Sequence, residues 1–288
     1  MATADLFSVA GRTAIVTGAS YGLGARMATT LAEAGANVVL AARSVDKLAE
    51  VATLVEAHGV KALVQGCDVT DPEQVAATVA ATWETFGRAD ILVNNAGYIA
   101  ETGIMPERIP DALFAQTMLT NVNGVFSFCR EVGARQLADG KGGSIINVAS
   151  VAGVGASAHF PSAYQASKAA VINLSRNLGV SWASRGVRVN ALCPGWFPSE
   201  MTGPFFAVEP FMKRISAMTP MQRVGREHEL DGALLFLASD ASSYMTGNQL
   251  VIDGGTSSHL GGVDYSDELF ETMTQIAGEY GTRIMPAT

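Results

Sequence analysis

The segment from Thr13 to Ala34 constrains the fold of this 288-residue chain more than any other. A short apolar run, Thr13–Thr17, leads into the sequence Thr-Gly-Ala-Ser-Tyr-Gly-Leu-Gly, and a stretch of helical composition, Ala25–Ala34, follows. Glycines at positions 18, 22 and 24 permit a tight strand-to-helix turn whose backbone N–H groups face outward. Such a turn holds the pyrophosphate of a dinucleotide or serves only as an ordinary tight connection.

Short β-branched runs alternate with longer stretches of helical period along the rest of the chain. This pattern is typical of parallel strands joined by crossover helices. The expected strands are Thr13–Thr17, Asn37–Ala41, Lys61–Cys67, Asp90–Asn94, Ser144–Ala149, Val187–Leu192 and Gln249–Ile252. The sequence therefore predicts an α/β, doubly wound, Rossmann-like fold with a seven-stranded parallel sheet flanked by helices. No linker or repeat interrupts the pattern, so residues 1–288 are expected to form a single domain.

Composition and charge restrict the partners and the location. The formal net charge is −8, and a phosphate backbone requires a basic excess, so nucleic acid is not an expected partner. Charged residues make up only 16 % of the chain, which favours surface buried between subunits of a homo-oligomer. The N-terminus lacks the pattern of a signal peptide, and no apolar run approaches the roughly 20 residues that span a membrane. We therefore expect a cytoplasmic protein without a membrane partner.

Cysteine and histidine spacing gives no sign of a disulfide framework or of a metal site. The three cysteines, Cys67, Cys129 and Cys193, are an odd number and lie far apart in apolar surroundings, which is typical of reduced thiols. The histidines stand alone rather than in pairs at metal-ligand spacing, at His58, His159, His228 and His259. No metal is expected.

The glycine loop also contains a pattern that belongs to a different class of enzyme. Gly18-x-Ser20-x-Gly22 matches the nucleophile elbow of an esterase, and Asp253 and His259 follow in the order of a catalytic triad. An elbow, however, follows a strand deep in its sheet, with an oxyanion-hole loop supplied by an earlier strand. Only about a dozen residues precede the first strand here, so a hydrolase is the disfavoured alternative.

Four further patterns occur in order after the glycine loop. They are Asn94-Asn95-Ala96-Gly97 at the end of the fourth strand, Asn121 in a long helix, Ser150 at the end of the fifth strand, and Tyr164-x-x-x-Lys168 at the start of the next helix. Together with the loop they resemble the short-chain dehydrogenase/reductase family over about residues 9–255. The resemblance implies an NAD(P)-dependent oxidoreductase that interconverts a secondary alcohol and a ketone of a small molecule.

The residue types suit that chemistry. A tyrosine with a pKa of about 10 exchanges protons poorly at neutral pH, and a lysine four residues later on the same helix face favours the phenolate. The resemblance implies that Tyr164 exchanges a proton with the substrate oxygen and that Ser150 hydrogen-bonds the same oxygen. It also implies that Lys168 binds the nicotinamide ribose and that Asn121 holds a water in a relay to Lys168. The non-catalytic alternative is a sensor or scaffold that only binds the dinucleotide.

The end of the second strand favours NADP over NAD. An NAD site usually places an acid there, whereas this chain reads Ala41-Ala42-Arg43-Ser44, and a guanidinium suits a 2′-phosphate. Two features leave the choice open, because Tyr21 stands where many NADP-using relatives have a second basic residue and Arg43 could stack on adenine. The cofactor contacts that the resemblance implies are Gly18, Ser20, Tyr21, Gly22, Leu23, Gly24, Arg43, Ser44, Asp68, Val69, Asn95, Ala96, Gly97, Tyr164, Lys168, Pro194, Gly195, Phe197 and Ser199.

The segments after the sixth strand point to the substrate side. Residues 199–222 are rich in Phe and Met and resemble the family's substrate lid, and His159 is a further candidate to face the substrate. The Phe-Pro-Ser-x-Met-Thr run from Phe197 is similar to that of 3-oxoacyl reductases and gluconate-type dehydrogenases of the family. The family resemblance also favours a homotetramer.

The last 33 residues, 256–288, continue beyond the point where members of the family usually end. Asp267–Tyr280 places apolar residues at helical spacing and predicts an amphipathic helix. A helix this short is marginal alone in water, so we expect it to dock on its own or a neighbouring subunit near the lid.

Overall fold

The computed structural model describes residues 3–157, 160–199, 202–259, 272 and 274–276. The chain divides into two compact units, Met1–Ser257 and Ser258–Thr288. In the first unit the strands are β1 (Thr13–Thr17), β2 (Asn37–Ala42), β3 (Ala62–Gly66), β4 (Ile91–Asn94), β5 (Gly143–Val148), β6 (Val187–Pro194) and β7 (Gln249–Ile252). They form one sheet in the order β3-β2-β1-β4-β5-β6-β7, with every neighbouring pair parallel. The predicted seven-stranded parallel sheet is confirmed, and no strand end differs from the expected one by more than two residues.

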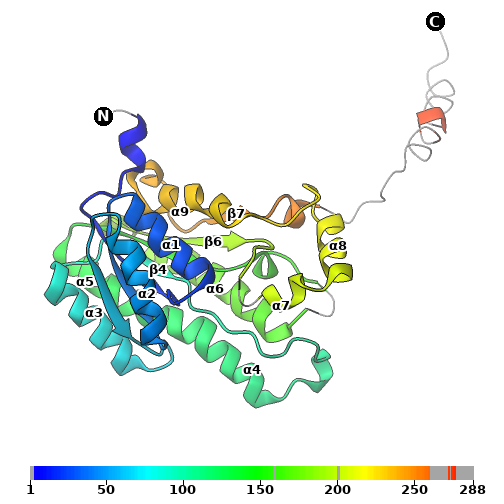
Figure 1. Cartoon of the computed structure of the whole chain (residues 1–288), viewed down its shortest axis with the longest axis horizontal. Helices are drawn as coiled ribbons and strands as arrows, with labels where there is room; N and C mark the ends of the chain where they lie inside the picture. The colour runs from blue at the N-terminus through cyan, green and yellow to red at the C-terminus, as the bar shows by residue number, and fades with distance from the viewer. Residues whose placement is uncertain (1–2, 158–159, 200–201, 260–271, 273, 277–288) are drawn as a thin grey trace, which may run out of the picture. The chain divides into compact units, whose positions relative to one another are not determined.

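Helices connect the strands (Figure 1). They are α1 (Gly22–Glu33), α2 (Val45–Glu56), α3 (Pro72–Phe86), α4 (Asp111–Met118), α5 (Gly124–Asp139), α6 (Ser162–Trp182), α7 (Gly203–Phe206), α8 (Glu209–Met218) and α9 (Asp231–Ala238). A π-helical turn, Leu119–Asn123, joins α4 to α5. The helix expected at Ala25–Ala34 begins three residues earlier, because the last glycines of the loop already belong to its first turn.

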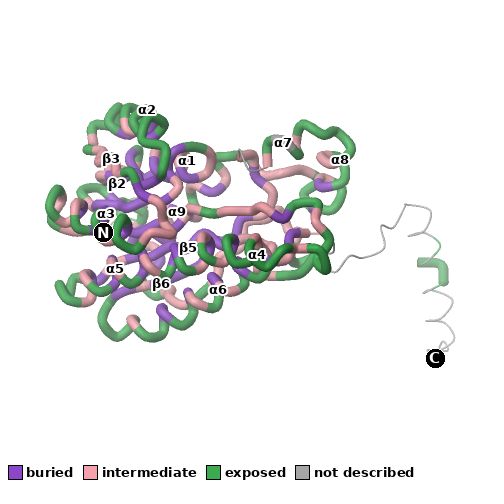
Figure 2. Tube along the Cα trace, turned by 90° about the horizontal axis from the view of Figure 1, so that it is seen from below, coloured by how far each residue is buried: buried purple, intermediate pink, exposed green. Residues whose placement is uncertain are grey.

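Side chains of the strands alternate between two cores, one on each face of the sheet. Along β1, Ala14 and Val16 belong to the first core and Ile15 belongs to the second. The helices α1, α2 and α9 cover the first core, and α3, α5 and α6 cover the second. Figure 2 shows the buried strands between helices whose outer surfaces are exposed. Full burial of a leucine or phenylalanine contributes about 2–3 kcal/mol, so packing against these two helix layers stabilises both faces of the sheet.

The parallel arrangement brings the carboxyl ends of all strands to one edge of the sheet. The glycine loop follows β1, the Asn-Asn-Ala-Gly segment ends β4 and follows it, and Ser150 comes shortly after β5. The short helices α7 and α8 lie beyond the end of β6 (Figure 1). None of the helices within the described residues is long and apolar enough to cross a membrane.

The second unit contains helical residues at 272 and 274–276. They fall inside Asp267–Tyr280, for which the sequence predicts an amphipathic helix. The rest of that span lies outside the described residues, and the docking of this segment remains a prediction.

Candidate active site

Gly18 and Gly24 of the loop after β1 have no space for a side chain. Gly18 and Gly22 have φ values of +64° and +56°, a conformation that side chains disfavour. A Cβ at Gly18 would lie 2.8 Å from the Cα of Ala96, and a Cβ at Gly24 would overlap the carbonyl oxygen of Gly18. The N-terminus of α1 follows directly, and Tyr21 precedes it in an extended, exposed conformation. The backbone therefore fits the expected pyrophosphate cradle.

The end of β4 braces this loop. The Asn95 side chain donates from Nδ2 to the carbonyl oxygens of Thr17 (3.1 Å) and Gly18 (3.2 Å). In return, the Thr17 hydroxyl accepts from the backbone N–H groups of Asn95 (3.0 Å) and Ala96 (3.1 Å). The two loops consequently form one rigid unit, in which the side chain of Asn95 is used for bracing.

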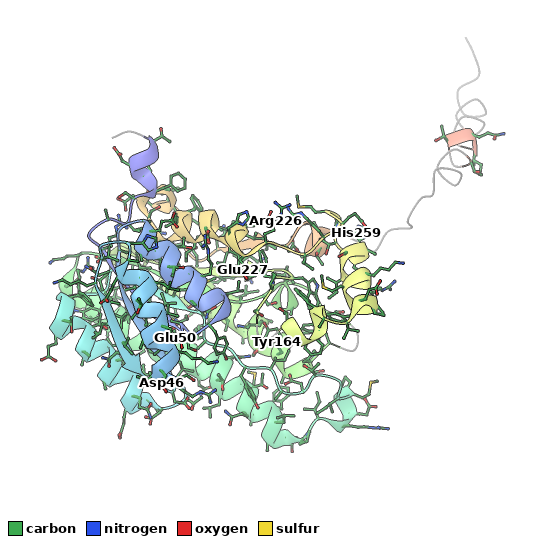
Figure 3. The ribbon with its side chains drawn as sticks, viewed as in Figure 1. Asp46, Glu50, Tyr164, Arg226, Glu227 and His259 are labelled. Atoms are coloured by element: carbon green, nitrogen blue, oxygen red, sulfur yellow. The ribbon has the colours of Figure 1, made fainter. Side chains whose placement is uncertain are left out.

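A second cationic side chain lies close to the loop and was missed in the sequence. Arg43 and Ser44 follow β2 and are exposed, as expected. Lys47, in the first turn of α2, places its Nζ 5.0 Å from the centre of the Tyr21 ring. Asp46, which is labelled in Figure 3, lies in the same first turn of α2 as Lys47. Lys47 of α2 therefore places a positive charge beside Tyr21, and in the sequence only its position four residues after Arg43 hints at this.

The remaining expected contacts of the cofactor's adenine half also lie at the carboxyl edge or beside it. After β3, Asp68 accepts from the N–H and hydroxyl of Thr70 at 2.9 and 2.7 Å. Val69 packs on Gly124 at the start of α5, where a Cβ would lie 2.9 Å from a Val69 methyl. In the glycine loop Ser20 is buried, and Leu23 is half-buried against the first core.

The structure brings together three of the predicted catalytic side chains. Tyr164 and Lys168 lie in the first two turns of α6, with Lys168 Nζ 5.5 Å from the centre of the Tyr164 ring. Lys168 Nζ donates to the carbonyl oxygen of Val148 at 2.9 Å. The Ser150 side chain acts to lower the pKa of Tyr164, and it caps the next turn by accepting from the N–H of Ala152 at 3.1 Å. Figure 3 shows Tyr164 on the side of the molecule where α7 lies.

The electrostatics of this pair differ from the expectation. Burial raises the pKa of Tyr164, although the hydrogen bond from Ser150 acts in the opposite direction. Burial also lowers the pKa of Lys168 to about 8, against a smaller opposing effect of Cys193. The expected lowering of the Tyr164 pKa by Lys168 is therefore not observed, because loss of hydration dominates both groups. At neutral pH Tyr164 therefore carries its proton.

Asn121, the fourth predicted catalytic residue, organises the neighbouring backbone. It is fully buried in the π-helical turn. Its Oδ1 accepts a hydrogen bond of 2.7 Å from the N–H of Tyr98. Its Nδ2 donates to the carbonyl oxygen of Tyr98 and to the hydroxyl of Ser167, both at 2.9 Å. Ser167 in turn donates to the carbonyl oxygen of Tyr164 at 2.8 Å. A Cβ at Gly97 would lie 3.6 Å from Lys168 Nζ and 3.9 Å from Asn121 Oδ1. Asn121 thus lies near Lys168, and its role in a water relay remains a prediction.

The segment after β6 has one departure from the expected contacts. Pro194 ends the strand, and a Cβ at Gly195 would lie 2.7 Å from the Cα of Asp253, so a glycine is required there. Phe197 is buried in the first core, which leaves only its backbone for the cofactor contact expected of it. The hydroxyls of Ser199 and Thr202 are 3.0 Å apart at the base of α7. His159 lies outside the described residues.

Two other features do not define the site. A cavity of about 730 Å³ is lined by Arg12, Arg88 and Arg188, at the amino ends of the strands and away from Tyr164. The hydrolase alternative depends on Asp253, whose two carboxylate oxygens accept from the backbone N–H groups of Gly255 (2.9 Å) and Ser257 (2.6 Å). Asp253 is therefore engaged in its own turn. All three cysteines are buried and free, as predicted.

Comparisons with known proteins agree with this geometry. A family model described as enoyl-(acyl carrier protein) reductase matches residues 18–257. Gluconate 5-dehydrogenase of Gluconobacter oxydans is 39 % identical over 255 residues, which cover 88 % of this chain and 98 % of the relative. Galactitol 2-dehydrogenase (L-tagatose-forming) of Cereibacter sphaeroides is 40 % identical over 251 residues, 87 % of this chain and 96 % of the relative.

Solved structures give the same result. A gluconate 5-dehydrogenase from Burkholderia cenocepacia, in complex with NADP and tartrate, is 34 % identical with a TM-score of 0.84, covering 89 % of this chain and 99 % of that one. The RhlG/NADP active-site complex of Pseudomonas aeruginosa is 37 % identical with a TM-score of 0.82, covering 88 % and 98 %. The chain belongs to the short-chain dehydrogenase/reductase family. It is an NAD(P)-dependent oxidoreductase that acts on a CH–OH group, and neither a hydrolase nor a non-catalytic scaffold.

Proposed function

We propose that the chain interconverts a secondary alcohol and a ketone with NADP in preference to NAD, and that Tyr164 exchanges the proton with the substrate oxygen. The observation that carries this proposal is the position of Tyr164 beside buried Lys168, whose Nζ lies 5.5 Å from the Tyr164 ring centre, with Ser150 acting on the pKa of the Tyr164 hydroxyl, at the carboxyl edge of the sheet. A protonated phenol held in this way is a general acid for ketone reduction.

In this proposal, each residue around Tyr164 has a separate role in the reaction. Ser150 orients the substrate oxygen, Lys168 binds the ribose hydroxyls beside the nicotinamide, and Asn121 holds the water of a proton relay that reaches Lys168. The dinucleotide, when bound, supplies or accepts the hydride at its nicotinamide. In reduction Tyr164 donates its proton to the carbonyl oxygen, and in oxidation the phenolate accepts it back.

The preference for NADP is supported by two cationic side chains near the glycine loop. Arg43 follows β2, and Lys47 lies over the Tyr21 ring. A 2′-phosphate carries about −1.5 to −2 charge and pairs with such cations, whereas a ribose 2′-hydroxyl gains little from them. The described relatives from Burkholderia cenocepacia and Pseudomonas aeruginosa are both complexes with NADP.

The proposal includes a single catalytic domain, a homo-oligomeric assembly, with a tetramer favoured, and a cytoplasmic location. Large apolar side chains are exposed on α4, the π-helical turn and α5, namely Phe114, Leu119 and Phe126. Covering them in a subunit interface removes apolar surface from water. The three free, buried cysteines suit a reducing compartment.

The proposal is tested with a panel of ketones and secondary alcohols, each assayed by nicotinamide absorbance with both cofactors. We expect turnover with at least one ketone and a higher kcat/KM for NADPH than for NADH. Turnover with NADH alone contradicts the cofactor preference, and oxidation or reduction of no member of the panel contradicts the reaction.

A further inference from the structure

Four aromatic side chains form a continuous group that ends on Tyr164, and we call Phe160, Trp196, Phe206 and Phe211 the aromatic wall. The Phe160 ring meets the Tyr164 ring edge-on with centres 6.0 Å apart, and Trp196 meets Phe160 edge-on at 5.8 Å. Trp196 also contacts Phe206 at 6.4 Å and Phe211 at 5.8 Å. The wall thus joins the segment before α6, the loop after β6, and both α7 and α8.

The aromatic wall is not part of the packed interior. Its four members are half-buried, and none of them belongs to either core among the described residues. Of the four, only Trp196 borders a cavity of about 360 Å³. Its lining also includes Asp253 and the ion pair of Arg223 with Glu229, which are joined by two hydrogen bonds of 2.7 Å. Partly exposed rings are available to a ligand, whereas core rings are not.

The position of the aromatic wall matches the expected place of a substrate. Trp196 follows Gly195 at the carboxyl end of β6, and ligands of doubly wound sheets bind outside these strand ends. Phe160 touches the ring that carries the reactive hydroxyl. A substrate whose oxygen reaches Tyr164 and Ser150 therefore extends its substituents past these rings.

Aromatic rings select the chemistry of those substituents. Sugar hydroxyls and carboxylates lose their hydrogen bonds to water against such a surface, and only polar groups of the site can replace those bonds. An apolar arm gains from leaving water and from stacking on the rings. Burial raises the pKa of Tyr164 and lowers that of Lys168, in keeping with a site from which water is largely excluded.

We infer, on the basis of the proposed oxidoreductase function, that the substrate is a ketone or secondary alcohol with an apolar arm, aromatic or alkyl, that lies along the aromatic wall. This class differs from the polyhydroxylated compounds after which the gluconate and galactitol dehydrogenases among its relatives are named.

The test compares three ketones with the full-length enzyme and NADPH: 4-phenylbutan-2-one, butan-2-one, which lacks the phenyl group, and D-fructose, a polyhydroxylated ketone. We expect kcat/KM for 4-phenylbutan-2-one to exceed that of each of the others by about tenfold or more, which corresponds to 1.36 kcal/mol of transition-state binding. An equal or higher value for D-fructose overturns the inference.

Variants of the aromatic wall locate the selectivity. Trp196→Ala should lower the ratio of kcat/KM for 4-phenylbutan-2-one to that for butan-2-one by about tenfold, whereas Trp196→Phe should retain most of it. Phe211→Ala, on α8, should lower the same ratio. It tests the inference independently if Trp196→Ala does not fold. Phe7→Ala removes an exposed aromatic ring from the N-terminal turn and is the matched control. An unchanged ratio in both alanine variants of the wall overturns the assignment of the arm to it.

The outcomes separate this inference from the proposed function. Turnover of D-fructose without turnover of 4-phenylbutan-2-one leaves the oxidoreductase proposal standing and overturns only the substrate class. Turnover of no ketone and no secondary alcohol with either cofactor overturns both.

Discussion

The carboxylate of Glu101 accepts a hydrogen bond of 2.7 Å from the backbone N–H of Tyr164. Tyr164 is the third residue of α6, so its N–H has no partner within the helix. The second oxygen of Glu101 accepts from the Thr117 hydroxyl at 3.1 Å and from the N–H of Ala100 at 3.2 Å, and the side chain is fully buried. One buried carboxylate therefore fixes the start of α6 relative to α4 and to the segment after β4.

Removal of this carboxylate should move Tyr164. Glu101→Ala leaves two N–H groups and the Thr117 hydroxyl without an acceptor, and we expect it to lower the free energy of unfolding by about 1–3 kcal/mol. It should also reduce kcat more than it raises KM for NADPH, because the displaced group acts on the substrate. Glu101→Gln keeps one acceptor oxygen, so its stability and its kcat should lie between those of the wild type and those of Glu101→Ala. Loss of stability with unchanged kcat in both variants would show that Glu101 acts on folding alone.

The role of Tyr164 has a direct test. Tyr164→Phe deletes the hydroxyl but preserves the ring that contacts Phe160, so the fold and the cofactor site should persist. We expect kcat to fall by at least about 100-fold, the contribution of a positioned general acid. The Kd of NADPH, followed by its fluorescence, should stay within about twofold of the wild-type value. Turnover at the wild-type rate would mean that another group donates the proton.

The proposed preference for NADP predicts separate effects for two cations, Arg43 and Lys47. We expect Arg43→Ala to weaken NADPH binding by about 1.5–3 kcal/mol, the scale of a hydrogen bond to a charged group, and to leave NADH binding nearly unchanged. Lys47→Ala should act in the same direction with a smaller effect, because its ammonium lies 5.0 Å from the centre of the Tyr21 ring. Titration of each variant with both cofactors gives the two losses.

A matched control separates specific pairing from net charge. Lys61→Ala removes one exposed positive charge immediately before β3, at the amino end of that strand and therefore away from the glycine loop. It should leave the affinities for NADH and NADPH unchanged. Equal losses of NADH and NADPH affinity in Arg43→Ala would indicate that the guanidinium stacks on adenine rather than pairing with a phosphate.

The fold was predictable because its signals are local. Each strand is a short apolar or β-branched run, and parallel pairing buries both of its faces, so runs such as Ile91–Asn94 stand out from the helices between them. The glycine loop was predictable for a similar reason, since Gly18 and Gly24 occupy positions where a Cβ meets backbone. The spacing of Tyr164 and Lys168 on one helix face belongs to the same group of local signals.

The parts that sequence reasoning missed depend on tertiary contacts. Glu101 is an isolated acid in a loop, and only the folded chain places it under the first turn of α6. Lys47 reads as a solvated helix residue until α2 packs beside the glycine loop. Trp196 and Phe160 are 36 positions apart in the sequence, and no periodicity relates them. The pKa of Tyr164 was misjudged because burial, which spacing does not reveal, outweighs the nearby charge.

The C-terminal extension gives a further prediction. Deletion of residues 256–288 should lower the melting temperature or raise the apparent KM of the substrate, because an apolar helix stripe that docks on protein contributes to stability or to the lid. The oligomeric mass of the truncated chain is measured in parallel. Unchanged mass, melting temperature and kinetics would show that the extension takes no part in the fold or in the site.

Stability should depend on pH through Lys168, whose side chain is buried and whose pKa is lowered to about 8. The unfolded chain holds the same proton up to about pH 10.4, so between these values it binds more protons than the folded chain, and stability rises with pH. Below pH 8 the buried ammonium costs about 3 kcal/mol relative to the alkaline limit.

Lys168→Met keeps the apolar length of the side chain and never carries the charge. We expect the wild type to gain stability relative to Lys168→Met by about 1 kcal/mol or more as the pH rises from 7.5 to 9.5, measured by urea unfolding at each pH. Loss of the hydrogen bond to the Val148 carbonyl adds an offset that does not change with pH, since neutral lysine donates as well. The thiols of Cys129 and Cys193 titrate in both proteins and contribute little to the difference. A gap between the two proteins that stays constant over this range would mean that the ammonium of Lys168 is fully hydrated in the folded chain.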